Sequence, residues 1–91
     1  MEQKVRKFIR FYGWVQGVGF RYRAKHAADS YGCTGWVHNE YDGSVAMEIQ
    51  GSERQIDMVI LTIEKGNFIR IENMDIKYME ADDNERSFVY R

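Results

Sequence analysis

The chain has 91 residues, of which 44% are hydrophobic and 30% are charged, and its net charge at pH 7 is −1. This size and composition predict one globular domain spanning residues 1–91, and the charge excludes a strongly basic nucleic-acid binder. A single cysteine and two histidines exclude a disulfide framework, a Cys-x-x-Cys redox pair and most Cys- or His-based metal centres. There is no apolar run of about 18 residues and no apolar leader. We therefore expect a cytoplasmic protein that does not enter a membrane.

Residues 5–12 are a short run rich in β-branched and aromatic side chains. Apolar residues occur at both odd and even positions, which predicts a central strand buried on both faces. Three glycines punctuate the following stretch, 13–19. An apolar stripe then predicts a helix over 20–31 that ends at Gly32, a residue suited to the left-handed conformation. The stripe consists of Phe20, Ala24, Ala27, Ala28 and Tyr31.

Residues 34–40 and 44–50 read as two strands, and the Asp-Gly turn between them predicts a hairpin. Ser52 and Gln55 have the spacing of a capping box at the start of a second helix. The apolar residues of this helix recur at helical spacing as far as Gly66. They are Ile56, Val59, Ile60 and Ile63.

Apolar residues within 70–79 predict a further strand, and Phe88 and Tyr90 predict a short last one. The acidic segment between them, 81–86, reads as a loop of solvated charges, and Glu48 is interpreted in the same way. The order βαββαβ predicts the ferredoxin-like α+β fold, an antiparallel sheet with both helices on one face. The short C-terminal strand is an addition to this plan.

The stretch 13–21 carries the strongest chemical signal. Glycines between a strand and a helix let backbone amides converge, and the first turn of the helix adds unpaired N–H groups and the positive end of its dipole. Arg21 places a cation where the helix dipole repels it, which is favourable if an anion lies between them. The alternative is a tight turn with a solvated arginine. A Walker loop and a dinucleotide fingerprint do not fit, because neither a Gly-Lys pair nor a third spaced glycine is present.

Residues 13–21, Gly-Trp-Val-Gln-Gly-Val-Gly-Phe-Arg, resemble the first signature of the acylphosphatase family, which is Gly-x-Val-Gln-Gly-Val-x-Phe-Arg. Residues 35–39, Gly-Trp-Val-His-Asn, followed by Asp42, Gly43, Val45 and Gly51, resemble its second signature. The resemblance covers essentially the whole chain. It implies a small ferredoxin-like enzyme that hydrolyses acyl phosphates without a metal or organic cofactor.

By the same resemblance, Arg21 binds the phosphate and Asn39 orients the attacking water. The backbone amides of five residues would form the phosphate cradle: Gln16, Gly17, Val18, Gly19 and Phe20. Two positions depart from the family pattern, because Trp14 and His38 stand where basic residues are common. Period two places His38 and Asn39 on opposite strand faces. These departures concern substrate preference rather than the activity.

The chemistry is consistent with so few functional groups. An acyl phosphate releases a carboxylate, whose conjugate acid has a pKa near ~4, so the leaving group needs little help from an acid. Phosphoryl transfer then requires positioning and stabilisation of charge on the phosphoryl oxygens. A neutral amide such as Asn39 can orient water but cannot act as a base. We therefore expect the water proton to go to the phosphate of the substrate.

Two alternative functions stay open on the sequence. One is a module of this family that binds phosphate or a carbamoyl group without catalysis. The other is an RNA-binding domain of the same topology, which the lack of aromatics in 44–50 disfavours. For partners, we expect an acyl phosphate as substrate and inorganic phosphate as product and competitive inhibitor. We expect neither nucleic acid nor a membrane as a partner. We also expect the protein to be a monomer.

Overall fold

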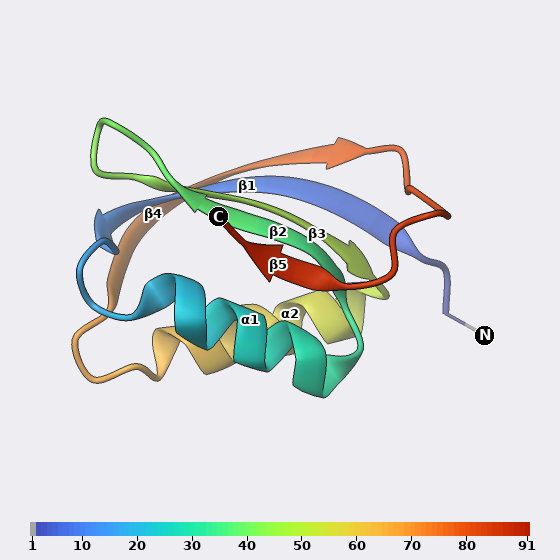
Figure 1. Ribbon diagram of the computed structural model, residues 1–91, viewed down its shortest axis with the longest axis horizontal. Coiled ribbons are helices and arrows are strands. Elements are labelled where there is room, and N and C mark those ends of the chain that lie inside the picture. Colours follow the sequence, from blue (N-terminus) through green and yellow to red (C-terminus); the bar gives the residue numbers. More distant parts are fainter. Residues whose placement is uncertain (1) are drawn as a thin grey trace.

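The computed structural model describes residues 2–91, and its elements follow the predicted order, with a fifth strand at the end (Figure 1). The predicted starts of both helices are confirmed within one residue. The seven elements are β1 (Val5–Trp14), α1 (Phe20–Tyr31), β2 (Thr34–Asn39), β3 (Val45–Gly51), α2 (Glu53–Glu64), β4 (Arg70–Met79) and β5 (Phe88–Tyr90).

The five strands form one sheet in the order β4-β1-β3-β2-β5. β1 is therefore an interior strand with a neighbour on each side, as its two-sided apolar sequence predicted, and β3 is the middle strand. The antiparallel arrangement is confirmed for the four longer strands. β5 instead lies parallel to β2, with Val37 opposite Tyr90, so the complete sheet is mixed. This short strand brings the last residues of the chain alongside β2.

Both helices pack on one face of the sheet, and Figure 1 shows them side by side beneath it. Their predicted apolar stripes are buried except at Tyr31, which is only partly buried, and Phe11 of β1 packs against Phe20 of α1 with ring centroids 4.9 Å apart. The predicted capping box at Ser52 and Gln55 is formed in both directions. Neither helix, in the part of the chain that the structure describes, is long and apolar enough to cross a membrane.

β1 extends two residues beyond its predicted end, because Gly13 and Trp14 pair with β4 after a register shift. A side chain at Gly13 would place its Cβ 2.3 Å from the carbonyl oxygen of Arg70. This glycine therefore serves close approach between two strands rather than the loop that follows. The loop, 15–19, lies at the same end of the molecule as the β2–β3 hairpin and the α2–β4 turn (Figure 1).

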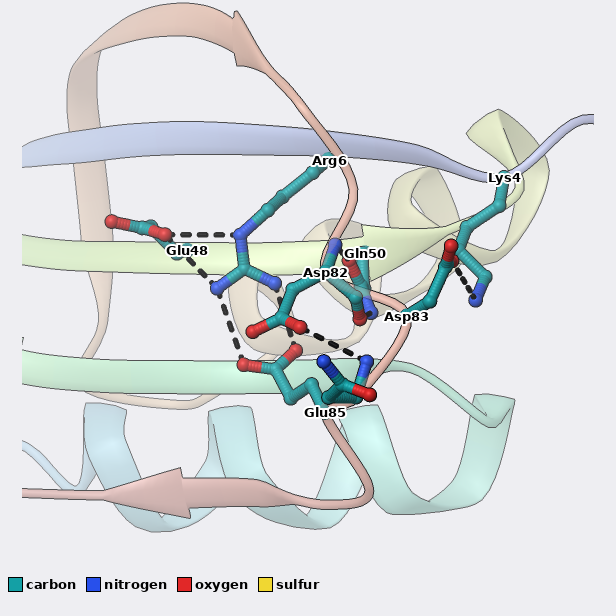
Figure 2. A network of polar contacts seen from close by, with 8 residues as sticks. Lys4, Arg6, Glu48, Gln50, Asp82, Asp83 and Glu85 are labelled. Carbon is teal, nitrogen blue, oxygen red and sulfur yellow. Dashed lines mark hydrogen bonds and ion pairs between the residues drawn. The ribbon is translucent and has the colours of Figure 1, made fainter.

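The face of the sheet away from the helices carries a buried cation, and Figure 2 shows it between two carboxylates. Arg6 donates hydrogen bonds to Glu48 at 3.0 Å and to Glu85 at 2.8 and 3.2 Å. The side chains of the three residues are only 7, 18 and 17% exposed, respectively. The interpretation of Glu48 and Glu85 as solvated charges is therefore wrong: both pair with Arg6.

The loop between β4 and β5 is fastened by the same region. The side-chain amide of Gln50 donates a hydrogen bond to the backbone carbonyl of Asp82 and accepts one from the backbone N–H of Asp82, both at 2.8 Å (Figure 2). The hydrogen bonds that Arg6 donates to Glu85, together with those to Glu48, outweigh burial and raise the pKa of Arg6. The cluster of Arg6, Glu48, Gln50, Asp82 and Glu85 is called the β3–loop cluster below.

Candidate active site

The loop between β1 and α1 presents unpaired backbone amides. Gly17 and Gly19 have φ angles of +72° and +81°, a region that side chains disfavour. Gly19 is the N-cap of α1, and no side chain caps the helix. Within residues 2–91, the backbone N–H groups of residues 16–20 donate a hydrogen bond to no acceptor. An unpaired helix N-terminus of this kind can bind an anion.

Arg21 lies in the first turn of α1 and is half-buried. Its guanidinium donates one hydrogen bond, from Nη1 to the backbone carbonyl oxygen of Arg91 at 2.5 Å, and lies 6.0 Å from the ring centroid of Tyr90. It pairs with no carboxylate side chain among the described residues. The remaining N–H groups of this cation are therefore available to a ligand.

Asn39 is the last residue of β2, next to the hairpin. Its side-chain amide makes no hydrogen bond to another residue in the part of the chain described here. His38, the preceding residue, is exposed, with Nδ1 3.6 Å from a carboxylate oxygen of Glu40. An unoccupied amide at this position can accept a hydrogen bond from water.

The two predicted catalytic side chains border one small cavity of about 170 Å³. Arg21 and Asn39, 18 residues apart in the sequence, both line it. Of the five predicted cradle residues, Gly17, Gly19 and Phe20 line this cavity, and Gln16 and Val18 do not. The remaining lining residues are Val15, Tyr22 and Tyr90.

Gln16 has a structural position that its sequence did not predict. Its side-chain amide nitrogen donates to the carbonyl oxygen of Glu40 at 2.6 Å and to that of Ser44 at 2.8 Å. These bonds tie the β1–α1 loop to the hairpin that follows Asn39. The first signature contains Gln16, but nothing in the spacing of residues along the chain shows a contact with residues 24 and 28 positions later.

The hairpin itself is stabilised by Asp42, whose carboxylate accepts a hydrogen bond from the backbone N–H of Ser44 at 2.9 Å and another from its hydroxyl. These bonds, the hydroxyl's first, lower the pKa of Asp42. Ordinary Asx-turn geometry thus holds the segment onto which Gln16 is fastened.

Tyr90 lines the cavity, and the sequence did not reveal this position. It contacts the site because β5 lies parallel to β2, and the sequence gives no local signal of that pairing. As for metals, residues 2–91 contain no group of three or more His, Cys, Asp or Glu side chains placed to hold an ion.

Comparisons with known proteins identify the family of the chain. The family model described as Acylphosphatase matches residues 7–90. An acylphosphatase of Clostridium acetobutylicum is 43% identical over 84 residues, which are 91% of this chain and 92% of the relative. An acylphosphatase of Oceanobacillus iheyensis is 45% identical over 72 residues, which are 77% of this chain and 79% of the relative.

Solved structures give the same result. The crystal structure of acylphosphatase from Bacillus subtilis matches with a TM-score of 0.86 at 27% identity and covers 96% of this chain and 98% of that one. Full-length HypF, in a phosphate- and nucleotide-bound form, matches with a TM-score of 0.86 at 26% identity, over 100% of this chain but only 12% of that one. By its sequence relatives over most of its length, the chain belongs to the acylphosphatase family, whose members hydrolyse acyl phosphates.

Proposed function

We propose that the 170 Å³ cavity is the active site, in which Arg21 and the amides of residues 16–20 hold the phosphoryl group. The observation that carries this proposal is that a guanidinium with free N–H groups, unpaired backbone amides and an unpaired side-chain amide border one small cavity. A phosphoryl group offers three oxygens to these donors. Charge-assisted hydrogen bonds to such oxygens are the strong ones in proteins, and they strengthen as charge develops in the transition state.

Asn39 then orients the water. Its carbonyl oxygen accepts a hydrogen bond, and the water oxygen attacks phosphorus in line with the acyl oxygen. The bond between phosphorus and the acyl oxygen breaks, and its electron pair leaves with the carboxylate. The water proton goes to a phosphoryl oxygen, so the products are a carboxylate and inorganic phosphate. No protein base is needed for these steps.

The same arrangement predicts how the product behaves. Inorganic phosphate presents the same oxygens to Arg21 and the loop amides, so it competes with the substrate. The protein acts on a small molecule as a monomer in the cytoplasm, and neither nucleic acid nor membrane takes part. Analytical ultracentrifugation at micromolar concentration checks the monomer.

A hydrolysis panel in the presence of a chelator tests the proposal. Acetyl, carbamoyl and benzoyl phosphate should all be hydrolysed, and a phosphate monoester, whose leaving group is a poor one, should not. Hydrolysis of the monoester at a comparable rate would contradict a site that depends on an activated substrate.

The role of Asn39 is tested by Asn39→Ala. We expect kcat to fall by about 10²-fold, because positioning of the nucleophile is lost, while inhibition by phosphate is kept. Asn39→Asp is the matched control, since it retains an acceptor of the same shape but adds a negative charge. Loss of phosphate affinity with kcat preserved in Asn39→Ala would show that the roles of Asn39 and Arg21 are assigned wrongly.

A further inference from the structure

Two larger cavities adjoin the proposed phosphate site. Their volumes are about 800 and 580 Å³, and both are bounded by the β1–α1 loop and the α2–β4 turn. The larger one shares Gly17 and Gly19 with the 170 Å³ cavity, so the two cavities border the same part of the loop. Figure 1 shows that the loop and the turn lie at the same end of the molecule.

The small cavity is too small to hold the acyl group of a substrate as well as its phosphoryl group. A volume of about 170 Å³ lies below that of ordinary small-molecule sites, which run ~300–1,000 Å³, and it is already lined by the groups proposed to hold the phosphoryl group and the water. The acyl group must therefore extend beyond this cavity. The 800 Å³ cavity continues from the shared glycines and is large enough for a ring.

The lining of the 800 Å³ cavity is aromatic at two positions. Trp14, at the end of β1, is 69% exposed, and Phe68, in the α2–β4 turn, is 75% exposed. Val18 of the loop completes an apolar surface in the same cavity. Large exposed rings gathered on one cavity are characteristic of a surface that meets an apolar ligand. Arg70 lies at the same cavity and contributes a positive charge, which suits an anionic substrate.

We propose that Trp14, Val18 and Phe68 form an acyl-group subsite that favours aromatic over small acyl phosphates. The proposal rests on the proposed function, because it requires the phosphoryl group to lie at Arg21 and the loop amides.

The test compares kcat/KM for benzoyl phosphate and acetyl phosphate in the wild type, Trp14→Ala and Phe68→Ala. Each variant should lower kcat/KM for benzoyl phosphate by about threefold to tenfold, the range of one aromatic contact, and leave acetyl phosphate nearly unchanged. The ratio between substrates is compared across variants, so their different intrinsic reactivities cancel. Trp14→Phe should restore most of the ratio.

Tyr41→Ala is the matched control, because this ring is fully exposed at the hairpin tip and lines neither cavity. An equal fall for both substrates in Trp14→Ala and Phe68→Ala would overturn the subsite, as would an unchanged ratio. Selective loss of benzoyl phosphate in Tyr41→Ala would place the acyl group on the hairpin side instead.

Failure of the proposed function has a different signature. It would appear as activity or phosphate inhibition that does not depend on Arg21, whatever the ratio between substrates. Inhibition by inorganic phosphate should be unchanged in all three alanine variants, because none of them alters the phosphoryl donors. A weaker inhibition in Trp14→Ala or Phe68→Ala would show a general disturbance of the loop and would overturn the selective role.

Discussion

Arg6 is buried and Arg21 is half-buried, and their surroundings differ in kind. Arg6 is enclosed by the β3–loop cluster and donates to two carboxylates (Figure 2). Arg21 donates to one backbone carbonyl and otherwise borders a cavity with unpaired amides. A cation whose donors are all used holds the fold together. A cation with donors left over, beside a helix N-terminus that repels it, has a place for an anion.

The largest expected effect comes from the cation with free donors. Arg21→Ala should lower kcat/KM for acyl phosphates on the order of 10³-fold and abolish inhibition by phosphate, because two or more charge-assisted hydrogen bonds are lost. The free energy of unfolding in urea should change by less than about 0.5 kcal/mol. Arg21→Lys, which keeps the charge but not the planar fork, should recover part of the activity. Near-normal hydrolysis of benzoyl phosphate by Arg21→Ala would defeat the assignment.

The enclosed cation should respond in the opposite way. Arg6→Ala should lower the free energy of unfolding by about 3 kcal/mol, since Glu48 and Glu85 lose the cation that compensates their burial. Its kcat at a temperature well below unfolding should match the wild type. Urea denaturation and steady-state kinetics on the same preparation measure both quantities.

A triple variant, Arg6→Met with Glu48→Gln and Glu85→Gln, serves as the control. It removes the partners together with the cation and should recover much of the lost stability. If Arg6→Ala leaves the protein as stable as before, the β3–loop cluster is not what fastens the β4–β5 loop.

Sequence reasoning singled out residues that line one cavity, but it misread the partners of the enclosed cation, and the difference has a physical reason. The glycines, the helix start and Arg21 are adjacent in the chain, so local geometry brings their functions together. The pairing of Arg6 with Glu85 joins residues 79 positions apart, and no local pattern indicates it. The acidic loop therefore read as solvated, although Glu85 is largely covered.

The same distinction applies within the proposed active site. The family signatures contain both Arg21 and Asn39, but only the fold shows that they line one cavity. Tyr90 and the side chain of Gln16 were missed as a neighbour and a support of the site, because each depends on a contact with residues distant in sequence. Strand pairing places Tyr90, and contacts between two loops place Gln16, and neither is indicated by periodicity or capping.

Substitution of Gln16 should lower activity less than substitution of Arg21, because Gln16 acts as a positioning residue. Gln16→Ala should lower kcat about tenfold with little change in inhibition by phosphate, since the loop loses its two bonds to the hairpin that carries Asn39. Gln16→Glu keeps the shape but cannot donate, so it should resemble Gln16→Ala. A fall in thermal stability alone, with kcat unchanged in both variants, would reduce Gln16 to a purely structural role.

The smallest expected effect concerns Cys33. Beside the enclosed cation and the cation with free donors, it is a buried group with no partner among the described residues. Burial raises the pKa of this thiol to about 11, so it stays neutral where Arg6 stays charged. The native thiol should resist iodoacetamide at pH 8 and react after unfolding in urea. Rapid alkylation of the native protein would show that the thiol is not enclosed.

The sign of the pH effect follows from the same raised pKa. The unfolded thiol ionises near its ordinary pKa of ~8.5, whereas the folded one retains its proton up to about pH 11. The contribution of Cys33 to stability is therefore complete below pH 8 and is lost as the pH rises toward 11, by about 2 kcal/mol at pH 10. Cys33→Ala lacks this group, so its unfolding free energy should fall less steeply between pH 8 and pH 10. Parallel pH profiles for the two proteins would mean that the thiol ionises equally in both states. Burial would then not keep an unpaired group neutral at this position.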